Sequence, residues 1–85
     1  MRRFRDRDGR AWVATVACED GGDYKGRFHF VVDGEGDNEG RRVSLTDVRW
    51  NSSRTAERTL ATMSEVELRR RLRSALGRAT RAAAV

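Results

Sequence analysis

The sequence of 85 residues predicts an α+β fold, in which a four-stranded antiparallel β-meander is followed by a short helix and a longer C-terminal amphipathic helix packed on one sheet face. Apolar residues recur with period two in the first half of the chain, as in strands that bury one side. After residue 52 the period becomes 3.6, which indicates amphipathic helices. The connections between the expected strands are short, so consecutive strands should be neighbours. We expect one small domain over residues 1–85.

The first two strands are expected over residues 2–7 and 10–18. Asp8-Gly9 separates these two extended runs, and Asp-Gly in that position is a strong signal for a β-hairpin. Phe4 is the only large apolar residue of the first run, so it should face the core. In the second run Trp12 begins the apolar face that meets the helices.

The third and fourth strands are expected over residues 26–32 and 41–46, separated by an acidic, glycine-rich loop. Phe28 and Phe30 should point into the core with Leu45, because they alternate with polar neighbours. An antiparallel sheet can leave its second face in water. That open face would carry Val13, Thr15, Ala17, His29, Val31, Ser44 and Thr46.

Two helices are expected over residues 53–62 and 65–79. Ser52 or Ser53 should cap the first helix, since a serine oxygen can accept a hydrogen bond from a free amide of the first turn. Ser64, with Glu67 three residues on, predicts a capping box for the second helix. The glycine at position 77 lowers helix propensity, so the last turn of that helix is expected to fray.

Charge is unevenly distributed along the chain. Seventeen arginines and one lysine stand against thirteen acids, which gives a net charge of +5. Residues 1–10 carry net +3, residues 11–40 net −5, residues 41–60 net +3 and residues 61–85 net +4. Both ends are therefore basic and the middle is acidic. Arginine offers a planar fork of donors that suits phosphate and carboxylate groups alike.

Several classes of protein are disfavoured by composition. One cysteine, Cys18, excludes an intramolecular disulfide framework, and with a single histidine, His29, it excludes a zinc site built from one chain. No catalytic or phosphate-loop signature is present, and the acids of residues 33–39 do not match the spacing of a calcium loop. We therefore expect no enzyme activity, no metal and no cofactor.

The sequence also indicates a compartment. No apolar run approaches 18 residues, so we expect no membrane-spanning helix. Asp6 and Asp8 interrupt the start of the chain, which argues against a signal peptide. A lone cysteine fits the reducing cytoplasm, and Cys18 is expected to be a small buried residue.

The basic ends favour a small module that binds nucleic acid mainly through arginine–phosphate contacts. Arginines at period two on the first strand would form a row about 7 Å apart on the side opposite Phe4. Arginines also occupy the exposed arc of the second helix, and Trp50 could offer a stacking surface. The candidate nucleic-acid-binding residues are Arg3, Arg5, Arg7, Arg41, Arg42, Arg49, Trp50, Arg70 and Arg73.

A second hypothesis is a protein-interaction or regulatory accessory domain. Its open sheet face would contact an acidic protein partner or a second copy of the chain in a homodimer. The arrangement of charge distinguishes the two hypotheses. A contiguous arginine surface favours nucleic acid, whereas acids from residues 19–23 or 33–39 lying among the arginines favour a protein partner. The sequence does not separate DNA from RNA, or one base sequence from another.

Overall fold

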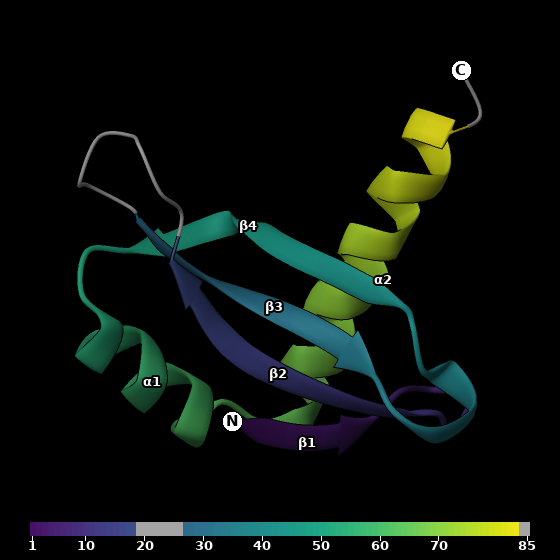
Figure 1. Cartoon of the computed structure of the whole chain (residues 1–85), viewed down its shortest axis with the longest axis horizontal. Helices are drawn as coiled ribbons and strands as arrows, with labels where there is room; N and C mark the ends of the chain where they lie inside the picture. The colour runs from purple at the N-terminus through teal and green to yellow at the C-terminus, as the bar shows by residue number, and fades with distance from the viewer. Residues whose placement is uncertain (19–26, 84–85) are drawn as a thin grey trace.

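The four strands pair in chain order into one antiparallel sheet, β1-β2-β3-β4, which confirms the predicted meander and α+β class (Figure 1). The structure, a computed structural model, describes residues 1–18 and 27–83, so the expected acidic loop at 19–23 lies outside the described residues. The elements are β1 (Arg2–Arg5), β2 (Ala11–Cys18), β3 (Phe28–Gly34), a 3₁₀ turn η1 (Gly36–Asn38), β4 (Arg42–Trp50), α1 (Ser53–Thr62) and α2 (Glu65–Ala83).

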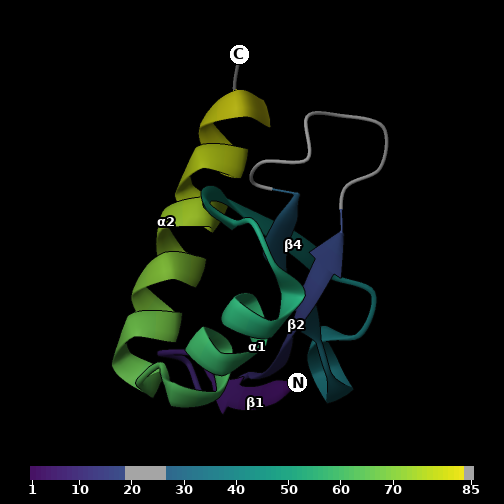
Figure 2. The same ribbon diagram turned by 90° about the vertical axis from the view of Figure 1, so that its left-hand side faces the viewer.

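Both helices lie on the same side of the sheet (Figure 2). The buried side chains of β1 to β4 meet those of α1 and α2 in one core, as expected from the alternation of apolar residues. Trp12 is at its centre with none of its surface exposed. The other fully or nearly fully buried members are Phe4, Ala14, Phe30, Val32, Leu45, Ala56, Leu60, Leu68, Leu72 and Ala75.

Strand β1 ends at Arg5, two residues earlier than predicted. Asp6 stops it, because its Oδ1 accepts hydrogen bonds from the amides of Asp8 and Arg10, each at 2.9 Å. These bonds close a turn in which Gly9 adopts a left-handed conformation with φ of +82°. The predicted row of strand arginines, Arg3, Arg5 and Arg7, is therefore wrong for Arg7, which belongs to the turn.

The connection between β3 and β4 is an ordered turn, although most of its residues are exposed to solvent. Strand β3 extends to Gly34, whose amide donates to the Arg41 carbonyl at 2.9 Å. A Cβ on Gly34 would lie 2.1 Å from the Asn38 carbonyl oxygen, so the turn requires glycine there. The Asn38 side chain is 3% exposed, which was not predicted. At its other end β3 begins at Phe28, later than predicted.

Strand β4 is longer than the predicted 41–46 and runs on to Trp50. Phe30 pairs with Leu45 but Phe28 pairs with Trp50, so β4 carries several extra residues opposite a single residue of β3. This irregularity places the Trp50 ring on Phe30, with centroids 4.3 Å apart. The strand thus ends at a residue whose ring stacks on a core aromatic.

The helices follow their predicted capping residues. Helix α1 has the predicted bounds, and the Ser52 hydroxyl accepts from the Thr55 amide at 3.1 Å. The Ser64 hydroxyl accepts from the Glu67 amide at 3.1 Å and so starts α2. The Glu67 carboxylate does not return to Ser64 but contacts Arg70 and Arg71. Helix α2 continues to Ala83, past the predicted end at 79, and extends beyond β4 (Figure 1).

Two expectations about exposure are wrong. Cys18, at the last position of β2, is exposed rather than buried. On the open face, His29 and Val31 are only 8% and 7% exposed. They lie on β3, an inner strand flanked by β2 and β4, so neighbouring side chains cover them from both sides.

Candidate nucleic-acid interface

A groove of about 760 Å³ runs between the β1–β2 turn and helix α2. It combines four arginines with two acids from the turn and three apolar side chains from the helix. We call it the arginine groove, and its lining residues are Asp6, Arg7, Asp8, Val66, Arg69, Arg70, Leu72, Arg73 and Leu76.

The turn holds one wall of the groove in place. Besides the hydrogen bonds from the two backbone amides that close the turn, the Asp6 carboxylate accepts a hydrogen bond of 2.9 Å from Trp12 Nε1. Burial raises the pKa of Asp6, but the hydrogen bonds from Trp12, Arg10 and Asp8, with the charge of Arg10, outweigh burial and lower the pKa below its ordinary value. A charged Asp6 thus anchors the turn that carries Arg7.

Helix α2 supplies the other wall. Arg69 donates to the Arg5 carbonyl at 2.8 Å and to the Glu65 carboxylate at 3.1 Å, which ties α2 to β1. Arg70 forms an ion pair with Glu67 at 3.4 Å, one helical turn earlier. Because Arg70 and Arg73 are three residues apart on the helix, they are neighbours on its surface. In the described part of the chain Arg73 makes no ion pair, and neither does Arg7 across the groove.

The arginines of β1 are already engaged. Arg3 forms an ion pair with Glu35 at 3.4 Å, and Arg5 donates to the Gly9 carbonyl at 2.7 Å. They flank a second hollow of about 480 Å³, which adjoins the groove because Arg69 lines both. Here acids lie among the arginines, as the protein-interaction hypothesis expected for residues 33–39.

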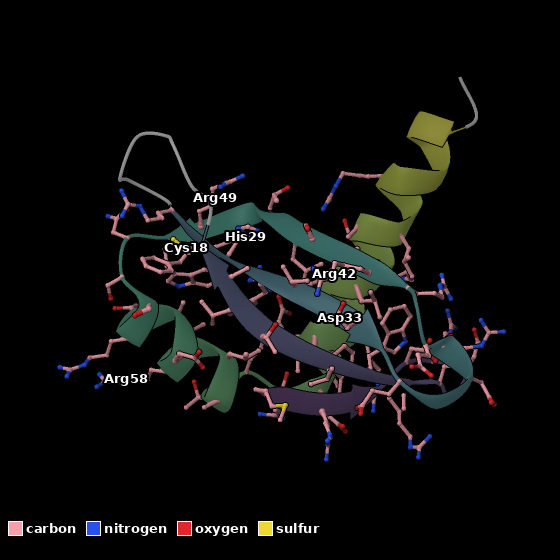
Figure 3. The ribbon with its side chains drawn as sticks, in the orientation of Figure 1. Cys18, His29, Asp33, Arg42, Arg49 and Arg58 are labelled. Atoms are coloured by element: carbon pink, nitrogen blue, oxygen red, sulfur yellow. The ribbon has the colours of Figure 1, made fainter. Side chains whose placement is uncertain are left out.

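Arg41 and Arg42 lie on opposite faces of the sheet. Arg42 forms an ion pair with Asp33 at 2.7 Å across the β3–β4 pairing, on the face away from the helices (Figure 3). The adjacent Asp33 raises the pKa of Arg42, chiefly through this hydrogen bond. The Arg41 guanidinium instead covers the Trp12 ring, 5.1 Å from its centroid, where it shields the core. Neither joins the arginine groove.

Arg49 and Trp50 lie at the far end of β4. Figure 3 places Arg49 near His29 and Cys18, away from Arg42. Trp50 is half-buried and stacks on Phe30, so one face of its ring belongs to the core. Of the nine predicted residues, the groove unites only Arg7, Arg70 and Arg73.

Arg69 is the groove arginine that the prediction missed. The sequence does indicate that Arg69 and Arg73 share one helix face, because they are four residues apart. What the sequence did not show is that this face meets the β1–β2 turn. The carbonyl of Arg5 and the side chain of Arg7 come from that turn region, more than sixty positions earlier in the chain.

The described residues offer little for other chemistry. Among them, no group of three or more His, Cys, Asp or Glu side chains is placed to hold a metal ion. No helix in the described ranges is long and apolar enough to cross a membrane. No protein-family model matches the chain, and no curated protein or solved structure shows significant similarity to it.

Proposed function

We propose that this protein is a non-enzymatic module that binds the phosphate backbone of nucleic acid through the arginine groove. One observation carries the proposal: Arg7, Arg69, Arg70 and Arg73 converge on one surface groove from two elements distant in sequence. Guanidinium groups bind phosphate through paired hydrogen bonds as well as charge. The net charge of +5 adds long-range attraction to a polyanion.

The ion pairs divide the arginines into two groups. Arg3 and Arg42 already face the carboxylates of Glu35 and Asp33, so a phosphate would have to compete with these acids. Of the groove arginines, Arg69 and Arg70 pair with Glu65 and Glu67 on their own helix. Arg7 and Arg73 form no ion pair among the described residues. We therefore assign phosphate contact to the groove rather than to β1. The lone cysteine supports a cytoplasmic location for this activity.

The test is a titration with single- and double-stranded oligonucleotides as a function of salt. The Arg70→Ala, Arg73→Ala double variant should weaken binding. The matched control is Arg54→Ala with Arg58→Ala, which removes the same charge from exposed positions of α1, where Arg58 points away from the body (Figure 3). Failure of the wild type to bind any oligonucleotide at about 50 mM salt, where phosphate contacts are strongest, would remove the proposal.

A homodimer through the open sheet face is the second candidate. On this face no helix covers the described part of the sheet (Figure 2), and its middle is uncharged at Val13, Thr15 and Ala17. The buried His29 Nδ1 on the same face has no hydrogen-bond partner in the described chain. Sedimentation over a range of concentrations tests this: a dimer that Thr15→Arg dissociates supports it, and a monomer at all concentrations excludes it.

A further inference from the structure

The arginine groove has an apolar wall that phosphate contacts alone do not explain. Val66 projects from α2 with 62% of its surface exposed, although it is a large apolar residue. The half-buried Leu76 also lines the groove, whereas Leu72 is 1% exposed and belongs to the core. On a helix, residues 66 and 76 lie about 15 Å apart along the axis and about 80° apart around it, with Arg69 and Arg73 between them, so apolar and arginine side chains alternate along the groove.

A double helix has no exposed base faces that could contact the apolar side chains of the groove. The faces of its bases are stacked inside, so a protein meets phosphates, sugars and base edges but not base faces. A single strand exposes the faces of its bases, which can lie on apolar side chains or on guanidinium planes while the phosphates meet arginines. The groove, of about 760 Å³ and open to solvent, is large enough to admit a base.

The two turn acids restrict where the phosphates can lie. The Asp6 carboxylate is occupied by Trp12 and by backbone amides. Asp8 is exposed at the groove and has no ion pair within the described residues. Its charge repels phosphate at the turn, so the backbone should follow Arg70 and Arg73 on the helix side.

From these observations we infer that the arginine groove takes single-stranded nucleic acid in preference to duplex. The bases lie against Val66 and Leu76, and the phosphates lie on Arg70 and Arg73. This inference rests on the proposed function, because it names the form of nucleic acid that the same groove binds. It adds that bases, and not phosphates alone, contribute to affinity.

The test compares three probes on the folded wild-type chain by fluorescence anisotropy: a single-stranded oligonucleotide, the same strand with abasic sites, and the matching duplex. The abasic strand keeps every phosphate and loses the base faces. We expect the intact single strand to bind about fivefold to tenfold more tightly than either other probe, the effect of covering most of one valine side chain. Val66→Ser should abolish this preference, whereas Val48→Ser, at an exposed valine of β4, should keep it.

Substitution of single acidic residues gives a second measurement of how the strand lies in the groove. Asp8→Asn should tighten binding of the single strand, and Glu57→Gln, which removes one exposed acid from α1, should have a smaller effect. Equal binding of intact and abasic strands by the wild type overturns the inference and leaves the proposed function standing. Full displacement of the strand by polyglutamate at equal charge concentration also overturns it, in favour of an acidic protein partner. Absence of binding to all three probes removes both proposals.

Discussion

The carboxylate of Asp6 accepts a hydrogen bond of 2.9 Å from the indole nitrogen of Trp12, a side chain with no exposed surface. This one contact links the turn that carries Arg7 to the centre of the core. It also satisfies the only polar atom of the Trp12 ring, which would otherwise be buried without a partner. The position of one wall of the arginine groove therefore depends on core packing.

Asp6→Asn should destabilise the protein in a pH-dependent way. The pKa of Asp6 is lowered in the folded state, so its stabilising effect is present above the unfolded pKa and is lost as pH falls through the folded pKa. At neutral pH we expect a loss of about 1–2 kcal/mol in the free energy of unfolding. The difference between denaturant melts of the two proteins should begin to shrink at about pH 4 and should vanish only below the lowered pKa of the folded state. A difference that stays constant down to acid pH would mean that the charge of Asp6 is not involved.

Gly34→Ala should cost more than the same change at Gly9. The new Cβ at position 34 would lie 2.1 Å from the Asn38 carbonyl, and backbone on both sides cannot yield cheaply. We expect a loss of about 3 kcal/mol or more. At Gly9 a Cβ meets nothing within 4 Å, and only its φ of +82° is unfavourable, at about 1 kcal/mol. Thermal melts that fall equally for both variants would contradict the ordered β3–β4 turn.

Ser64→Ala should remove the hydrogen bond to the Glu67 amide that starts α2. The expected cost is about 1 kcal/mol. For a domain of this size that lowers the melting temperature by roughly 4–8 °C. Ser53→Ala is the control, because this serine lies inside the first turn of α1 and the cap there is Ser52. Equal melting temperatures for Ser64→Ala and the wild type would place the start of α2 elsewhere.

The salt dependence of binding should show whether the phosphate contacts come from the arginine groove or from β1. Arg70→Ala with Arg73→Ala should flatten the slope of log affinity against log salt by up to about 1.4–1.8, the value for two lost phosphate contacts. The ion pair with Glu67 reduces the share of Arg70, whereas Arg73 forms no ion pair among the described residues. From the sequence alone, Arg3→Ala with Arg5→Ala should flatten the slope by the same amount. In the structure Glu35 already opposes Arg3, so we expect less than half that change. Equal flattening by the two pairs would argue against the groove as the main site.

The sequence by itself determined the class of fold and the start of each helix, because both depend on local patterns. Alternation around Trp12 and Phe30 specifies a sheet with one buried face, and the serines at 52 and 64 cap helices through neighbouring amides. The sequence likewise shows directly that both ends of the chain are rich in arginine. These features need no knowledge of distant residues.

Only the tertiary structure decided which arginines act together. Arg7 leaves the row on β1 because the turn at Asp6 intervenes, and several other arginines have partners that are distant in sequence. Arg3 meets Glu35 across the sheet, and Arg69 joins α2 to the carbonyl of Arg5. Such contacts depend on strand register and on the packing of α2 against β1, which no local pattern encodes.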